Sequence, residues 1–148
     1  CLHLCDTHPA AGLAPAVGTV QRAHFYKWLM WLTNTLQSAL IIYFYGERWM
    51  DEGNAAGAAE LKRHAQGKIG GMLDQLDAHL ASHGGPWFMG SDYSALDAYV
   101  FTLCRWTRNF SAAPARDRVT LGPYLQRVLA RPAVQRVIAN EKLAPPFI

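Results

Sequence analysis

The stretch at residues 90–97 reads Gly90-Ser91-Asp92-Tyr93-Ser94-Ala95-Leu96-Asp97, and it has the chemistry of a helix start. Ser94 is followed three residues later by a carboxylate, just ahead of an apolar run. We expect the Ser94 hydroxyl to accept a hydrogen bond from the N–H of Asp97, while the Asp97 carboxylate accepts one from the N–H of Ser94. The carboxylate also adds negative charge at the positive end of the helix dipole. The sequence therefore predicts a capped helix beginning at Ser94.

Apolar residues recur at helical spacing after this cap, namely Leu96, Tyr99, Val100, Leu103 and Cys104. This spacing predicts a strongly apolar face, so we expect the helix to be central in the fold and to continue to about Asn109. Burial on that face would raise the pKa of the Cys104 thiol and reduce its reactivity. We therefore interpret Cys104 as a core residue rather than a nucleophile.

Other helix signals lie on both sides of this segment. We expect a long helix from a Thr19 cap to about Tyr45, ended by Gly46. We expect a second from an Asn54 cap to about Ser82, ended by Gly84-Gly85-Pro86. The pair Gly70-Gly71 inside the second helix suggests the close approach of a neighbouring helix. Prolines predict two shorter helices, at 123–130 and 132–140. No stretch is typical of a strand, so the predicted fold class is all-α, a bundle of about five helices.

The first long helix is unusual because large apolar residues occupy more than one of its faces. From Trp28 to Tyr45 it contains no charged residue, which raises the alternative of a membrane span. Its middle, however, is polar, and hydrocarbon would penalise unpaired amides there. We interpret the polar residues as lining a cleft of a soluble protein; they are Thr33, Asn34, Thr35, Gln37 and Ser38.

The composition bounds the chain further. At 148 residues and 51% hydrophobic it suits one globular domain. Three cysteines without a recognisable signal peptide predict reduced thiols in a cytoplasmic protein. We expect no metal site, because helical spacing does not bring Cys1, His3 and Cys5 onto one ion.

Positive charge is concentrated in the C-terminal third of the chain. From residue 98 onward, only Asp117 and Glu141 oppose the basic residues Arg105, Arg108, Arg116, Arg118, Arg127, Arg131, Arg136 and Lys142. Such a bias would suit nucleic acid or an anionic small molecule. The arginines are scattered without a recognised reading motif, so we interpret them as solvated and expect no nucleic-acid partner.

Three segments of the chain point to a known family, namely Pro86 to Trp106, the pair Arg22-Ala23 with Trp28-Leu29, and Arg131 to Arg136. Together they resemble the C-terminal helical domain of bacterial, beta-class-like glutathione transferases. The resemblance implies that residues 1–8 are the tail of the last helix of a missing N-terminal thioredoxin-like domain. Residues 9–18 would then be a linker and residues 19–148 the helical domain, so we expect the chain to be a piece of a longer protein.

The resemblance also implies where a site would lie. The His-Lys pair of the beta class falls on Gln37 and Ser38, with Asn34 and Thr35 one turn earlier, so these four residues are the predicted glutathione contacts. Losing both basic groups leaves only hydrogen bonding there. The electrophile-pocket aromatics fall on Tyr99 and Trp106, with Phe110 one turn beyond, and Ile41 completes the predicted pocket. The opposing interpretation places Tyr99 and Trp106 simply in the core.

The resemblance predicts the substrate-pocket and dimerisation domain of a transferase that conjugates glutathione to apolar electrophiles. Its expected partners are the thioredoxin-like domain, a second copy of the chain, and an apolar electrophile, with glutathione as co-substrate and no membrane. No residue in the chain itself is predicted to be catalytic. The alternative is a non-catalytic interaction module of the same fold, which the loss of the His-Lys pair favours.

Overall fold

The computed structural model describes all 148 residues and is entirely helical. Its α-helices are α1 (Leu2–Thr7), α2 (Val20–Trp31), α3 (Ser38–Tyr45), α4 (Ala55–His83), α5 (Ala95–Arg105), α6 (Leu121–Leu129) and α7 (Pro132–Asn140). The only β-type pairing is an isolated bridge between Trp87 and Gly90. This confirms the predicted all-α class, and none of the helices has the length and hydropathy needed to cross a bilayer.

The first long helix is continuous but changes its winding in the middle. It begins where the Thr19 side chain accepts the N–H of Arg22 at 3.2 Å, as the capping pattern predicts. A π-helical segment, Leu32–Gln37, joins α2 to α3. As predicted, the helix ends at Tyr45 with Gly46 at its C-cap, although the φ of Gly46 is −55° and so is not the left-handed value common at helix ends. Gly46 is buried, and a Cβ there would lie 3.6 Å from the Leu61 side chain of α4.

The second long helix, α4, has the caps that the sequence predicts. Asn54 Oδ1 accepts the N–H of Gly57 at 2.9 Å, and Gly84 ends the helix with a φ of 62°. Helix packing against Gly70-Gly71 is a wrong prediction. A Cβ on Gly70 would meet only the Arg118 guanidinium, and one on Gly71 would meet nothing within 4 Å.

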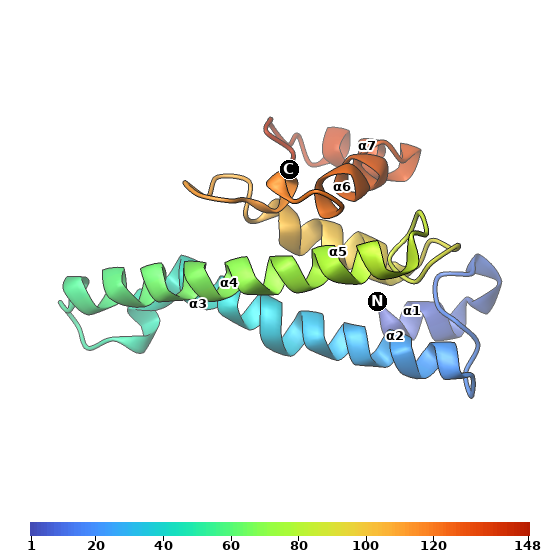
Figure 1. Ribbon diagram of the computed structural model, residues 1–148, viewed down its shortest axis with the longest axis horizontal. Helices are drawn as coiled ribbons and strands as arrows, with labels where there is room; N and C mark the ends of the chain where they lie inside the picture. The colour runs from blue at the N-terminus through green and yellow to red at the C-terminus, as the bar shows by residue number, and fades with distance from the viewer.

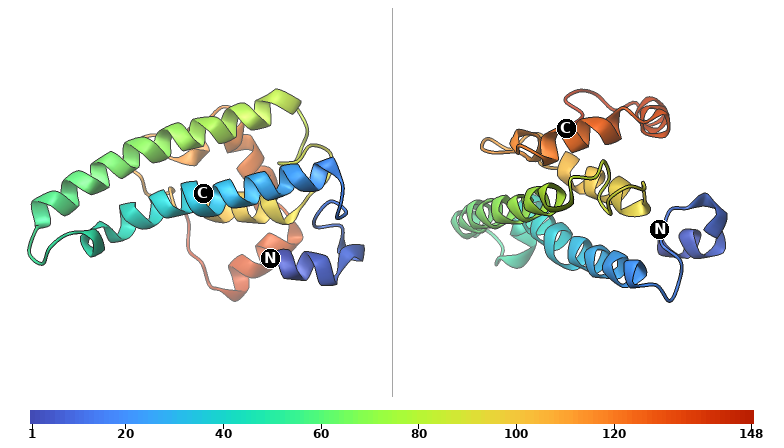
Figure 2. Two further views of the ribbon diagram at one scale, coloured as in Figure 1. Left: turned by 90° about the horizontal axis from the view of Figure 1, so that it is seen from below. Right: turned by 45° about the vertical axis from the view of Figure 1, so that its right-hand side comes forward.

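The helices form a hairpin with further helices stacked on it. The α2–α3 helix runs antiparallel beside α4, and α5 lies between this hairpin and the pair α6 and α7 (Figure 1). The shorter helix α1 lies beside the beginning of α2, at the end of the hairpin far from the α3–α4 connection (Figure 2). The predicted central position of α5 is therefore confirmed.

The start of α5 holds the bundle together through Asp97, which is fully buried. Its Oδ2 accepts the N–H of Ser94 at 2.7 Å, and the reciprocal capping box is formed, as predicted. Its Oδ1 accepts the N–H of Phe88 at 2.7 Å and the hydroxyl of Tyr124 at 2.9 Å. Burial, followed by the charge of Asp97, raises the pKa of Tyr124 well above its ordinary value. One carboxylate thus joins a helix start, the preceding loop and α6.

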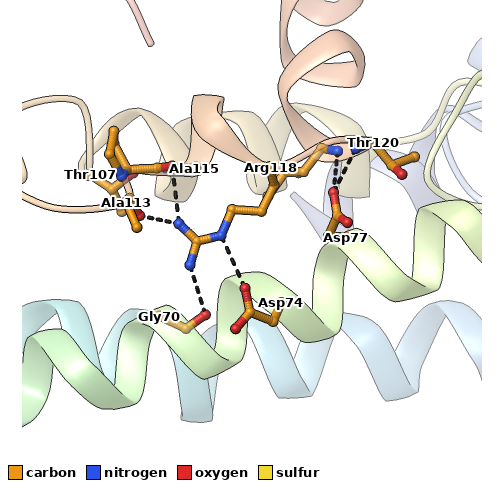
Figure 3. Close-up of polar contacts among 10 residues, drawn as sticks. Gly70, Asp74, Asp77, Thr107, Ala113, Ala115, Arg118 and Thr120 are labelled. Carbon is orange, nitrogen blue, oxygen red and sulfur yellow. Dashed lines mark hydrogen bonds and ion pairs between the residues drawn. The ribbon is translucent and has the colours of Figure 1, made fainter.

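A second polar cluster fixes the loop before α6 to α4 (Figure 3). Arg118 Nε contacts Asp74 Oδ1 at 3.1 Å, and Nη2 donates to the carbonyl of Gly70 at 3.2 Å. Its Nη1 donates to the carbonyl of Ala113. The guanidinium thus lies against the backbone of Gly70 on α4. Further along α4, Asp77 Oδ1 accepts the two N–H groups that begin α6, those of Thr120 and Leu121, at 2.8 and 2.7 Å.

Candidate functional site

The best-defined polar contact between predicted site residues lies where α5 runs beside the π-helical segment. The Tyr99 hydroxyl hydrogen-bonds to the side chain of Gln37 and lies 3.2 Å from Thr33 Oγ1. A phenol has one proton, so it donates to one of these groups at a time. If the Tyr99 hydroxyl donates to Thr33, a Gln37 amide turned to present its N–H can donate to the Tyr99 oxygen. Tyr99 and Gln37, predicted separately as pocket and glutathione residues, thus belong to one cluster.

The winding of the π-helical segment decides which polar side chains reach α5. Ser38 Oγ donates to the carbonyl of Thr33 at 3.3 Å, while the Thr33 hydroxyl donates to the carbonyl of Leu29 at 2.8 Å. Asn34 and Ser38 are exposed, and Thr35 is half-buried. Only Gln37 of the four predicted glutathione contacts bonds to α5.

One turn beyond this cluster, α3 and the end of α5 enclose an apolar hollow of about 230 Å³. Its lining residues are Ile41, Phe44, Tyr45, Trp106 and Arg108. The rings of Phe44 and Trp106 meet edge to face at a centroid distance of 6.4 Å. Two predicted pocket residues, Ile41 and Trp106, therefore line the same cavity. We call this cavity the Trp106 hollow.

The other two predicted pocket aromatics are placed differently. Phe110 is only 7% exposed, and its ring lies 4.3 Å from that of Tyr43. Its side chain therefore belongs to the core and does not line the Trp106 hollow, because α5 ends at Arg105 rather than at Asn109 and the chain then turns. Tyr99 is half-buried and does not line the Trp106 hollow; its hydroxyl instead contacts Gln37 and Thr33 on the π-helical segment.

A larger apolar groove of about 440 Å³ lies on the other side of Trp106, between α5 and α7. Its walls include Phe101, Val134 and Ile138, and one charged residue, Arg105, reaches it. The Nε of Arg105 is buried and has no hydrogen-bond partner. Burial, and then the nearby charge of Arg108, lower the pKa of Arg105 below its ordinary value. A wider depression on the outer face of α4 has mainly polar walls and no contact with the predicted site.

The chain offers no activated nucleophile near these cavities. Cys104 is buried, and burial raises the pKa of its thiol to about 12, which confirms the prediction that it is a core residue. Cys5 is also buried, and Cys1 lies at the exposed start of α1. No group of three or more His, Cys, Asp or Glu side chains is arranged to hold a metal ion.

Comparison with known proteins assigns the family. The model of the glutathione S-transferase C-terminal domain matches residues 19–131, which is most of the chain and includes the Asp97 cap, the Gln37–Tyr99 cluster and the Trp106 hollow. The chain belongs to this family. None of the curated proteins compared with it matches.

Solved bacterial glutathione S-transferases have the same arrangement of helices. BphK, a bacterial glutathione S-transferase solved as a ternary complex, is 26% identical with a TM-score of 0.79. A sphingomonad glutathione S-transferase complexed with glutathione is 28% identical, with a TM-score of 0.78. The beta-class enzyme of Sphingomonas chungbukensis is 26% identical, also with a TM-score of 0.78. These matches cover 96–97% of this chain but only 65% of each solved chain.

Several residues around the candidate site were not among the predicted glutathione and pocket residues. Thr33, predicted only to line the cleft, contacts Tyr99 from the same segment as Gln37, and its spacing of four residues from Gln37 was a signal for a shared face. Phe44 and Tyr45 follow Ile41 by one turn, which the same rule could have identified. Arg108 lies beyond the end of α5 and has no periodic signal, because a turn rather than a helix brings it to the Trp106 hollow.

Proposed function

We propose that this chain is the substrate-pocket and dimerisation domain of a glutathione transferase that conjugates glutathione to apolar electrophiles. The observation that carries the proposal is the order of groups along the two facing helices. The hydrogen-bonding Gln37–Tyr99 cluster precedes the aromatic Trp106 hollow by one turn on the first long helix, from Gln37 to Ile41, and by two turns from Tyr99 to Trp106. A polar tripeptide and an apolar electrophile would thus bind side by side, as bond formation between them requires.

The reaction needs a group that the cleft in this chain does not supply. The glutathione thiol loses its proton to solvent, the sulfur bonds to the electrophilic carbon, and the leaving group departs with its electron pair. Thr33, Asn34, Thr35, Gln37 and Ser38 donate hydrogen bonds but have no charge with which to lower a thiol pKa. Thiolate formation is therefore assigned to a thioredoxin-like domain, with residues 1–8 as its last helix and residues 9–18 as the linker.

The packing of the first residues supports that division. The linker contacts the helical domain through the carbonyl of Leu13, which accepts the N–H of Ala95 at 2.8 Å. Arg22 forms an ion pair with Asp6 of α1. The apolar groove between α5 and α7 offers a surface for the rest of such a domain to cover.

The remaining parts of the proposal concern assembly and location. We expect a homodimer, consistent with exposed large apolar residues on α2 such as Tyr26 and Met30. A cytoplasmic location agrees with three free cysteines, two of them buried. The competing function is a non-catalytic interaction module, which Gln37 and Ser38 favour because the beta class has a basic pair there.

The test compares the chain with its complete parent protein, using 1-chloro-2,4-dinitrobenzene and glutathione. The parent should form the conjugate, and the chain alone should not. Trp106→Ala in the parent should raise KM for the electrophile, with Arg136→Met on the exposed face of α7 as a matched control. A folded parent that forms no conjugate with any of a panel of aromatic electrophiles would favour the interaction module. Conjugation by the chain alone would overturn the two-domain argument.

A further inference from the structure

The Trp106 hollow contains one charged side chain that the proposed function does not use. Arg108 lines it together with Ile41, Phe44, Tyr45 and Trp106. Its only side-chain hydrogen bond runs from Nη1 to the carbonyl of Arg105, at 3.1 Å, and it makes no ion pair. An arginine in an apolar wall without a carboxylate partner has donors left for a ligand.

Two further cations lie close to this hollow and are equally unpaired. The guanidinium of Arg48 stacks 4.3 Å from the ring of Tyr45, which lines the cavity. The charge of Arg108 contributes to the lowered pKa of Arg105, so the two guanidinium groups are near each other. The Nε of Arg105 is buried and has no hydrogen-bond partner. The four ion pairs of the chain involve Arg22, Arg63, Arg116 and Arg118, so none of these three cations takes part. Like charges gathered without a counter-ion favour the binding of an anion.

The position of Arg108 is held by the backbone around it. Its carbonyl accepts a hydrogen bond from Arg116 Nη1 at 2.7 Å, and this guanidinium also donates to the carbonyl of Ile148 at 3.0 Å. The turn that carries Arg108 is therefore held at its backbone carbonyl by Arg116, which is itself tied to the C-terminal segment. A backbone positioned before the ligand arrives lowers the entropy cost of binding.

We propose that the Trp106 hollow binds flat aromatic electrophiles that carry a carboxylate, with Arg108 as the residue that recognises the anionic group. The aromatic wall accommodates the ring, and a volume of about 230 Å³ suits a ligand built on a single ring. The guanidinium fork of Arg108 matches a carboxylate by two parallel hydrogen bonds. This inference rests on the proposed function, since it names the substrate class of the same site.

The test measures binding rather than turnover, and it uses the chain as it is. The ligands are 4-chloro-3-nitrobenzoate and its methyl ester, which share the ring and differ in charge. Isothermal titration should show the carboxylate binding about tenfold tighter than the ester at low salt, and the preference should shrink as salt is added. Arg108→Met should remove that preference while leaving ester binding unchanged. Trp106→Ala should weaken both ligands, and Arg136→Met, on an exposed face of α7, should change neither.

The possible outcomes separate this inference from the proposed function. Equal binding of carboxylate and ester, or a preference that survives in a folded Arg108→Met chain, overturns the role of Arg108. Circular dichroism establishes that the variant is folded. Because the titration needs neither glutathione nor the thioredoxin-like domain, a carboxylate preference in the chain together with an inactive parent would contradict the proposed function alone. An active parent whose KM does not distinguish the two electrophiles would contradict the inference alone.

Discussion

The two ends of α5 treat polar groups in opposite ways. At the N-terminal end, Asp97 is fully buried and its carboxylate accepts hydrogen bonds from two backbone N–H groups and the Tyr124 hydroxyl. At the C-terminal end, Trp106 is half-buried, and the arginines on either side of it, Arg105 and Arg108, have no acidic partner. At the Asp97 end, the hydrogen bonds of the carboxylate are made within the chain. At the Trp106 end, the arginines keep unused donors beside an apolar cavity.

The difference shows how the same helix serves stability and binding. A buried charge is tolerated only when hydrogen bonds replace its water, so the Asp97 end must be saturated. A binding surface has to keep donors and apolar area available until a ligand arrives, and this lowers its contribution to folding. The stability of the domain should therefore depend on Asp97 far more than on Trp106 and its arginines.

The largest effect is expected from Asp97→Ala. The substitution leaves the N–H groups of Phe88 and Ser94 and the Tyr124 hydroxyl without a buried acceptor, so the free energy of unfolding should fall by about 3–4 kcal/mol. Urea denaturation followed by circular dichroism measures this loss. Asp97→Asn is the matched control: it keeps the shape and one oxygen, and it should lose about half as much. An unchanged urea midpoint for Asp97→Ala would contradict the claim that the Asp97 end contributes more to stability than the Trp106 end.

A paired arginine should matter to folding more than the unpaired ones. Arg118→Met removes the contacts to Asp74 and to the Gly70 carbonyl, and the free energy of unfolding should fall by about 2 kcal/mol. Arg63→Met is the control, because Arg63 and Glu60 are both exposed and 4.0 Å apart, and it should leave the urea midpoint almost unchanged. If Arg108→Met destabilised the chain as much as Arg118→Met, then Arg108 would be structural.

Tyr99 lies between the two ends of α5. Substituting it tests whether its hydrogen bond matters to stability as much as those of Asp97. Tyr99→Phe removes the hydroxyl that bonds to Gln37 and should cost about 1 kcal/mol, because water can reach the half-buried partners. In the parent protein the same change should lower affinity for glutathione if Gln37 is a contact. Gln37→Leu should reproduce the effect on affinity. A loss of stability equal to that of Asp97→Ala would mean that Tyr99 belongs to the stabilising end of α5 rather than to the binding surface.

The smallest effect concerns charge near the Asp97 end. His79 is half-buried against Trp28 and Phe88, and burial lowers its pKa although its Nε2 lies 2.9 Å from the carbonyl of Phe88. The unfolded chain then binds more protons than the folded one. Stability should be complete above the ordinary histidine pKa of about 6.5 and should decrease as the pH falls below it. Urea midpoints between pH 5 and 8 show this slope. His79→Gln should flatten it, whereas His64→Gln on the exposed face of α4 should leave it intact.

Sequence rules were most successful where a structure depends on neighbouring residues. The Ser94–Asp97 box, the caps at Thr19 and Asn54, the end of α4 at Gly84 and the beginning of α7 at Pro132 are all confirmed. Each depends on hydrogen bonds or backbone angles within about one helical turn. Such local chemistry can be recognised without knowledge of the fold, and the family resemblance, also confirmed, supplied the arrangement of the helices.

Contacts between distant segments could not be predicted in the same way. The Gly70-Gly71 pair indicated a close neighbour, but the neighbour is the side chain of Arg118 rather than a helix. The spacing of Phe110 agreed with a pocket position, yet the turn after Arg105 buries it against Tyr43. Periodicity extrapolates a helix beyond its true end, so errors accumulate where the chain turns.

The π-helical turn at Leu32–Gln37 sets which residues of the first long helix face α5. Such a turn takes up about one residue more than an α-helical turn, so the extra residue is absorbed inside the turn and α3 continues α2 as a single helix. Deleting one residue within the turn would restore a regular winding and leave Ile41 and Phe44 close to their present orientation. Deleting one residue from α3 ahead of Ile41 would instead rotate Ile41 and Phe44 by about a quarter of a revolution relative to Gln37. The position of a one-residue deletion would thus decide whether the Trp106 hollow still assembles, while the Thr19 cap would form in either case.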